Sequence, residues 1–205
     1  MSDVPLSAEA APRKRPEPGE RRVLILQALA EMLQAPEADR ITTAALAARL
    51  QLSEAALYRH FASKAQMFEG LIEFIETSLF TLANQVLERE TDAAAQMARI
   101  VTLVLQFAER NPGMGRVLAG DALVHEDARL QQRLNQAVDR LESLLRQPAR
   151  AWAEAQEHPS PTVAAQARAS LLMSFVLGRL HRHARSGFVR QPTEHLDAAL
   201  SSLLA

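Results

Sequence analysis

Hydrophobic residues recur along most of the chain at the three-, four- and seven-residue spacings of amphipathic α-helices. Within residues 41–68, ITTAALAARLQLSEAALYRHFASKAQMF, this spacing predicts two short helices at 43–50 and 54–61, separated by residues 51–53. A third helix is predicted to begin directly after Ser63. Two short helices joined by a tight turn form a helix-turn-helix, which presents its second helix to the major groove of DNA.

Capping residues support each of these boundaries. Thr42 or Thr43 can cap the first helix and Ser53 the second, because their hydroxyls accept otherwise unpaired backbone N–H groups. The run from Ser63 to Gln66 matches a capping box, in which the Gln66 side chain accepts a bond from the N–H of Ser63 itself.

The second helix of this motif has a buried face and an exposed face. Leu46, Leu50, Leu57 and Phe61 form one apolar seam, and burying it exposes the opposite face. That face carries charged, aromatic and small side chains suited to base edges and phosphates: Glu54, Ala55, Tyr58, Arg59 and, at its edge, His60. A plain solvated helix in a bundle is the structural alternative, but the caps, turn length and exposed face together favour DNA binding.

Breaker residues divide the rest of the chain. The sequence predicts a disordered, basic, Pro-rich tail at 1–19, a helix-turn-helix domain at 20–66 and a larger helical domain at 67–205. Further helices are predicted at 63–88, 92–110, near 115–119, at 122–157 with a kink or break at Pro148, at 161–186 and at 194–204, with Thr91, Ser160 and Thr193 as caps. Because strand patterns are absent from the sequence, the predicted fold class is all-α.

The predicted helix at 161–186 has more apolar surface than one face of a bundle requires, at Ala164, Ala167, Leu171, Leu172, Phe175, Val176 and Leu180. Pairing with a symmetry mate and the final helix would cover this surface in a four-helix interface. We therefore expect a homodimer, the commonest oligomer, which would bind a near-palindromic DNA site through two half-sites.

Composition limits the other functions. The 205 residues are 48% hydrophobic, enough for a full core, and contain no Cys, which excludes disulfides and thiolate chemistry and fits a reducing cytoplasm. No apolar run approaches the roughly 20 residues of a membrane span.

The histidines offer no metal site. His181 and His183 are two residues apart on a helix and cannot share a metal, and the side chains of the consecutive residues His125, Glu126 and Asp127 also point in different directions. The sequence predicts no enzyme, no cofactor and no metal.

Charge is distributed unevenly. The net charge is −1, but residues 11–64 carry nine Lys or Arg against six Asp or Glu, which makes the helix-turn-helix end positive. Arg13, Lys14 and Arg15, followed by Arg21 and Arg22, could lie along phosphates or in a minor groove; a solubilising tail explains the first three equally well.

The segment SEAALYRHFASK resembles the recognition-helix region of TetR-type regulators, with a Ser cap, a Leu-Tyr-x-His-Phe run and a Lys in that order. The resemblance extends through ERRVLILQALAEML and MFEGLIEFIETSL and covers about residues 20–192, except for 147–163. FAERNPGMGRVLAGDAL and the text at 127–136 are similar to one group of these regulators, DNA-bound inhibitors of the division protein FtsZ over the nucleoid. The alternative within the family is a transcriptional repressor with a small-molecule effector among the helices of residues 63–157; a bare interaction bundle is a third reading.

The resemblance implies a set of DNA contacts. Thr43, Ser53, Tyr58, His60 and Lys64 would contact phosphates, while Glu54, Ala55 and Arg59 would lie nearest the base edges.

The same resemblance implies a groove between the helices at 63–88 and 92–110 that receives the C-terminal tail of FtsZ, an acidic and apolar peptide. Phe74 and Leu103 would form its floor, Arg110 would pair with a peptide carboxylate and Asn111 would bond the peptide backbone. Gln106 stands where the family has a small residue and is expected to narrow the groove. The structural alternative to these partner contacts is that Phe74 and Leu103 are core residues and that Arg110 only caps a helix end.

Overall fold

A computed structural model of the protein describes residues 18–35 and 41–205. Within these ranges every regular element is helical, which confirms the predicted all-α class. The elements are α1 (Pro18–Met32), α2 (Thr43–Arg49), α3 (Glu54–Tyr58), α4 (Lys64–Arg89), α5 (Ala93–Arg110), α6 (Pro112–Leu118), the 3-10 turn η1 (Asp121–Leu123), α7 (Ala128–Ala155), α8 (Pro161–Arg185) and α9 (Leu196–Leu204). The predicted tail at 1–19 falls almost entirely outside the described residues.

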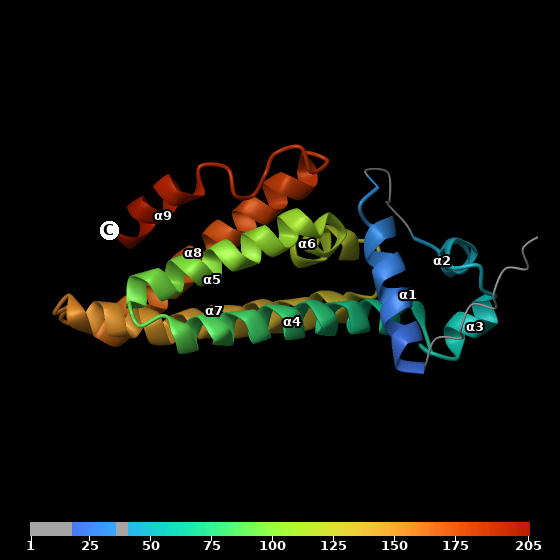
Figure 1. The fold of residues 1–205 in the computed structure, drawn as a ribbon, viewed down its shortest axis with the longest axis horizontal. Helices are drawn as coiled ribbons and strands as arrows, with labels where there is room; N and C mark the ends of the chain where they lie inside the picture. Colours follow the sequence, from blue (N-terminus) through green and yellow to red (C-terminus); the bar gives the residue numbers. More distant parts are fainter. Residues whose placement is uncertain (1–17, 36–40) are drawn as a thin grey trace, which may run out of the picture.

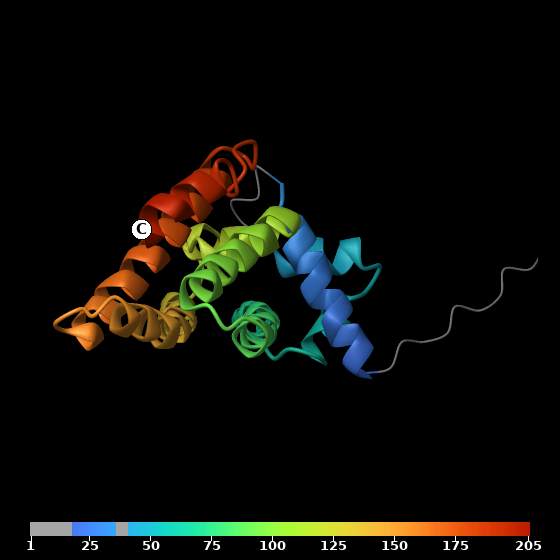
Figure 2. The same ribbon diagram turned by 60° about the vertical axis from the view of Figure 1, so that its left-hand side comes forward.

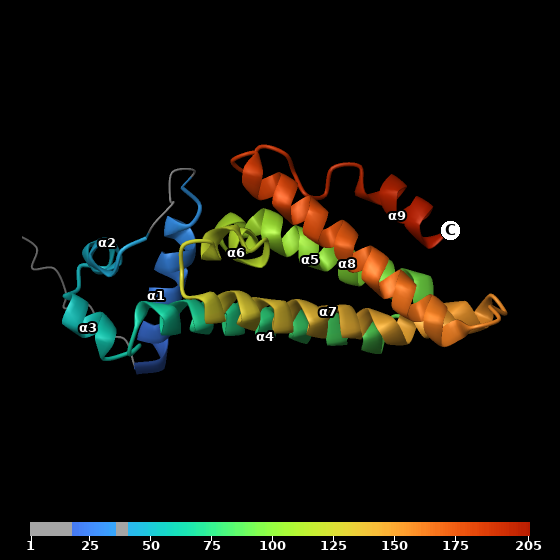
Figure 3. The same cartoon turned by 180° about the vertical axis from the view of Figure 1, so that it is seen from behind.

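The molecule is elongated, and α2 and α3 lie at one end of it (Figure 1). The long helices α4 and α7 run side by side along the body, and α8 crosses them diagonally when the molecule is seen from behind (Figure 3). Helix α1 packs across the ends of α4 and α6 that lie closest to α2 and α3. It thereby connects the α2–α3 pair to the rest of the protein (Figure 2). One continuous hydrophobic core extends from Ile25 in α1 to Leu200 in α9.

The turn between α2 and α3 has four residues, one more than the predicted three, because α2 ends at Arg49 and not at residue 50. Gln51 has a left-handed φ of 55°, and the N–H of Leu52 bonds the carbonyl of Ala47 at 2.9 Å, as in a Schellman helix end. The second helix is shorter than the predicted 54–61. It ends at Tyr58 because the N–H of His60 bonds Leu57 in a tighter turn, which carries Phe61 into the core.

Several caps differ from the prediction. Thr42, one of the two predicted candidates, caps α2, whereas Asp92, not the predicted Thr91, caps α5. Ser63 caps α4 as expected, but the Gln66 side chain accepts from the N–H of Ala62, one residue before the cap. These shifts follow from local geometry, since neighbouring side chains of similar chemistry compete for the same N–H groups.

The C-terminal helices also have different limits from those predicted. Residues 121–123 form η1, so α7 begins only at Ala128, and it continues through the buried Pro148 to Ala155. Ser160 precedes α8 but forms no side-chain cap bond. Thr193 does not cap the last helix, because its hydroxyl bonds Glu109 of α5; α9 begins at Leu196, after His195 with a φ of 53°.

Helix α6 lies unusually close to α1. A Cβ atom added at Gly113 would lie only 1.9 Å from the carbonyl oxygen of Ala30 in α1. Nearby, Arg116 donates to the carbonyl of Ala35 at 3.2 Å and pairs with Asp121 at 2.6 Å. Gly113 is the residue that lets α6 and α1 touch, because only a glycine leaves room for the Ala30 carbonyl.

In the described part of the chain, no helix is long and apolar enough to cross a membrane.

Candidate DNA interface and partner groove

The start of α3 is tied to α2 by side-chain bonds. Ser53 accepts from the N–H of Ala56 at 3.2 Å, which fixes the first turn of α3. The hydroxyl of Thr43 donates to the Glu54 carboxylate at 2.6 Å across the turn. Two residues assigned to DNA contacts by resemblance, Thr43 and Glu54, therefore bond each other in the DNA-free protein.

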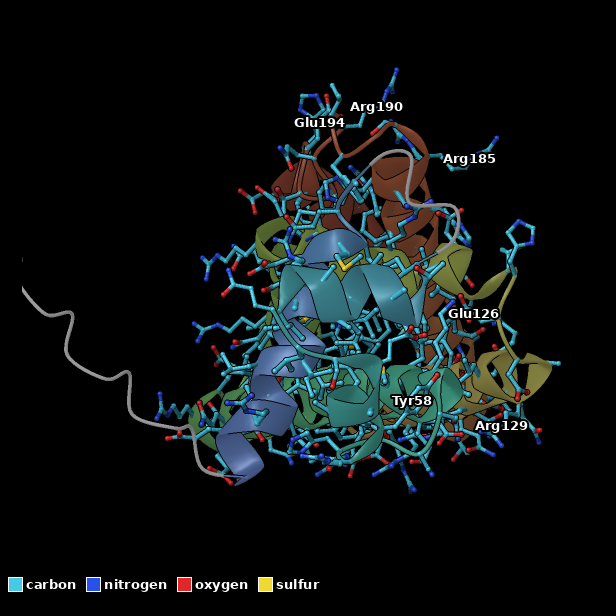
Figure 4. The ribbon with its side chains drawn as sticks, turned by 90° about the vertical axis from the view of Figure 1, so that its right-hand side faces the viewer. Tyr58, Glu126, Arg129, Arg185, Arg190 and Glu194 are labelled. Carbon is cyan, nitrogen blue, oxygen red and sulfur yellow. The ribbon has the colours of Figure 1, made fainter. Side chains whose placement is uncertain are left out.

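The exposed face of α3 is the one that the pattern predicts. Leu57 is fully buried, whereas Ser53, Glu54 and Ala55 are exposed. Tyr58 is 46% exposed, and Figure 4 shows it at the α2–α3 end of the molecule, facing the viewer. Arg59 is exposed and His60 half-buried just beyond it. The structure therefore brings these six side chains to one end of the protein.

Arg22 of α1 holds the end of the recognition helix. Its Nη1 donates to the carbonyl of His60 at 2.7 Å, and its guanidinium lies 4.2 Å from the centre of the Phe61 ring. The sequence offered Arg22 only as part of a basic arm on phosphates. The pairing joins residues 38 positions apart, so no local pattern could reveal it. The rest of the arm, Arg13, Lys14 and Arg15, lies outside the described residues.

Lys64, at the first position of α4, is already paired. Its ammonium lies 2.5 Å from the carboxylate of Glu126 and 5.7 Å from the centre of the Phe68 ring. Glu126 belongs to the segment between η1 and α7, and sequence analysis had considered it only as a weak metal ligand. In the described part of the chain no group of three His, Asp or Glu side chains could hold a metal ion.

A second feature is an open groove of about 910 Å³ along α5. Its walls come from the end of α4 (Leu82 and Val86), from one side of α5, and from α9. Helix α9 contributes four residues at helical spacing, Asp197, Leu200, Ser201 and Leu204. The predicted groove thus has a third wall, which α9 supplies.

Three of the four expected partner residues lie in this groove. Leu103, Arg110 and Asn111 line it, as does the exposed Gln106. Phe74 is not among its lining residues: it is half-buried against the core, two turns before Leu82 on α4. Phe74 therefore does not join the other three in this groove, which α4 reaches only near its C-terminal end.

The polar side chains of the groove differ in whether they are already paired within the protein. Arg110 is exposed and forms no ion pair with another described residue. The Asn111 amide instead donates to the carbonyl of Phe107 at 2.8 Å, where it also closes α5. Arg99 pairs with Glu90 at 3.0 Å. Arg110 is therefore the cation in this groove that is free to meet an acidic ligand.

Comparisons with known proteins agree with this geometry. The family described as "Bacterial regulatory proteins, tetR family" matches residues 25–71, and the SlmA-like family, "Tetracyclin repressor-like, C-terminal domain", matches residues 91–204. The chain is 49% identical to the nucleoid occlusion factor SlmA of Marinomonas over 85% of its length and 88% of the relative. It is 48% identical to SlmA of Vibrio atlanticus over 90% of its length and 94% of the relative.

The chain belongs to the SlmA family of TetR-type proteins. Its relatives are named as nucleoid occlusion factors, not as enzymes, in agreement with the sequence prediction. Solved TetR-type structures share the fold: FadR of Bacillus halodurans superposes with a TM-score of 0.75 over 94% of this chain and 97% of its own, at 12% identity. A putative TetR-family regulator of Rhodococcus gives 0.73 over 91% and 100%, at 18% identity.

The space among α4, α6 and α7 is nearly filled in this SlmA-family member. The cavity that Ile72, Leu79, Val117 and Leu141 help to line has a volume of about 10 Å³. That volume is close to one water molecule, far below the 300–1,000 Å³ typical of a small-molecule site. Phe74 and Phe107 pack against the core, and Phe107 also borders the groove.

Proposed function

We propose that the protein binds specific, near-palindromic chromosomal sites as a homodimer and, from the nucleoid, inhibits assembly of the FtsZ ring. The observation that carries the proposal is the SlmA-family identity, 48–49% over nearly the whole chain, together with a solvent-facing recognition helix.

The DNA contacts are assigned to the exposed end of the molecule. Tyr58, His60 and Lys64, together with Thr43 and Ser53, would bind phosphates and set the register of α3. Ala55, Arg59 and Glu54 would lie nearest the base edges, with Glu54 exchanging its bond to Thr43 for contacts to DNA. Phosphate contacts set affinity for all sequences, and base contacts set the preference among them.

A salt titration tests this assignment. Tyr58→Ala should weaken binding to every duplex, and Lys64→Ala should also lower the slope of log K against log salt by about one unit for each protomer. Arg150→Ala is the matched control, because Arg150 lies far from α3 on α7 and pairs with Glu154. Binding by both test variants that equals that of Arg150→Ala would contradict the assignment.

The groove along α5 is proposed to receive the FtsZ tail. An acidic and apolar peptide needs a cation and an apolar floor, which Arg110 and Leu103 supply, with Leu82, Val86 and Leu200 in place of Phe74. Asn111 would have to exchange its bond to Phe107 for the peptide backbone.

Charge reversal at Arg110 tests the groove. Arg110→Asp should abolish binding of a fluorescent FtsZ-tail peptide, because it replaces an attraction with a repulsion. Arg89→Asp is a close control: Arg89 is the last residue of α4 as Arg110 is of α5, so both changes disturb a helix C-terminus equally, but Arg89 is not among the residues that line the groove. Equal peptide affinity for the two variants would place the site elsewhere.

A further inference from the structure

One ion pair connects the DNA-facing end of α4 with the segment before α7. The ammonium of Lys64 and the carboxylate of Glu126 are 2.5 Å apart, and only 25% and 11% of their side chains are exposed. Figure 4 shows Glu126 at the same end of the molecule as Tyr58, facing the viewer. The ammonium of Lys64 is therefore already paired with a carboxylate at this end of the molecule.

We infer that Glu126 competes with the DNA backbone for Lys64 and so limits the affinity of the protein for DNA. This inference rests on the phosphate contact proposed above for Lys64. An ammonium has three N–H donors, so a second acceptor at about 2.8 Å would lie roughly 4.5 Å from the first. At that separation a phosphate and a carboxylate repel each other with about three-fifths of the energy with which either attracts the ammonium.

The surroundings offer Glu126 no ready substitute for Lys64. Arg129, also visible at this end in Figure 4, is shared between Glu69 at 3.2 Å and Asp127 at 3.4 Å. When Lys64 turns to a phosphate, it leaves behind a mostly buried carboxylate, which is unfavourable. Whether Lys64 is shared or released, Glu126 makes DNA binding weaker.

One substitution tests the competition between Glu126 and DNA for Lys64. Glu126→Gln keeps the size of the side chain and an oxygen acceptor but removes the negative charge. Glu73→Gln is the matched control, since Glu73 is exposed on the same helix as Lys64 and forms no ion pair with a described residue. Both variants change the net charge equally, so a difference between them cannot come from the net charge.

Affinity is measured with a fluorescent duplex that the wild-type protein itself selects from a random-sequence library. At low salt we expect Glu126→Gln to bind this duplex about three- to tenfold more tightly than wild type. Glu73→Gln should change the affinity by less than about twofold, because solvent and salt screen an exposed charge.

A second measurement follows Lys64 directly. Lys14 and Lys64 are the only lysines in the sequence, so reductive methylation with ¹³C-formaldehyde gives few signals, and a Lys64→Arg variant identifies the one from Lys64. The Lys64 signal should differ between wild type and Glu126→Gln when free. Addition of the duplex should shift the Lys64 signal of wild type more than that of Glu126→Gln, because only in wild type must Lys64 change partner.

The outcomes separate this inference from the function on which it rests. If Lys64→Ala weakens binding but Glu126→Gln binds no more tightly than Glu73→Gln, the competition is refuted and the phosphate contact stands. If the duplex leaves the Lys64 signal of wild type unmoved, the exchange of partners is refuted as well. If Lys64→Ala binds as wild type does, the phosphate contact itself fails and the inference fails with it.

Discussion

The contact between α6 and α1 can be tested by adding a single methyl group at Gly113. Gly113→Ala would place a Cβ 1.9 Å from the carbonyl oxygen of Ala30, 2.9 Å from its carbon and 3.2 Å from Cβ of Leu33. An ordinary carbon–oxygen contact is about 3.3 Å or longer, so the two helices would have to separate by more than about 1 Å. The atom that must move is backbone, so rotation of a side chain cannot relieve the clash.

The expected cost follows from two opposing effects. Overpacking of this kind costs about 1–3 kcal/mol, and a rigid backbone partner places Gly113→Ala at the upper end. Replacing glycine in a helix returns up to about 1 kcal/mol. The net loss of about 2 kcal/mol should lower the melting temperature by roughly 4–8 °C for a chain of this size.

The assay is thermal unfolding followed by circular dichroism at one fixed protein concentration, because dimer formation makes melting concentration-dependent. Gly19→Ala is the control: Gly19 lies in the first turn of α1, and no atom lies within 4 Å of its added Cβ. It should melt at the wild-type temperature or slightly above. If Gly113→Ala has the same melting temperature as Gly19→Ala, the close approach of α6 to α1 is not a feature of the folded protein.

Three further changes test other contacts. Arg22→Ala should weaken DNA binding roughly fivefold in a fluorescence titration, because the end of α3 loses its bond at His60 and its stacking on Phe61; unchanged affinity would remove Arg22 from the interface. Leu171→Arg should give monomers in sedimentation velocity, since Leu171 is 50% exposed on α8 while Leu172 is buried in the core of its own protomer; a dimeric variant would move the interface off this face. Arg168→Met should shift the fluorescence of Trp152, the only tryptophan, because Arg168 lies 3.8 Å over its ring and donates to Leu203 of α9; an unchanged spectrum would argue against this contact.

Local patterns predicted the features that local forces determine. Ser53 and Ser63 were recognisable as caps because a cap and the N–H groups that it binds are at most three residues apart. The buried Leu57 and the exposed Tyr58 followed from helical periodicity in the same way. An error of one residue, Thr91 in place of Asp92 as the cap of α5, arose because two adjacent polar residues could each serve as the cap.

Features set by distant parts of the chain could not be predicted from such patterns. The pairs of Arg22 with His60 and of Lys64 with Glu126 join residues 38 and 62 positions apart. Helical spacing on α4 does not show which of its residues border the groove along α5: Leu82 and Val86 do, and Phe74 does not. The wall that α9 adds to the groove likewise depends on the path of residues 186–195, which Thr193 fixes by its bond to Glu109.

Assembly of purified FtsZ, followed by light scattering, tests the central proposal most directly. The full-length protein is added with a duplex that it binds, with a scrambled duplex, and alone. The account predicts that scattering falls in the presence of the protein with its cognate duplex, and that Arg110→Asp with the same duplex leaves it unchanged. Scattering that the wild-type protein never alters, although it binds the duplex, would contradict inhibition of FtsZ and leave a transcriptional repressor as the function.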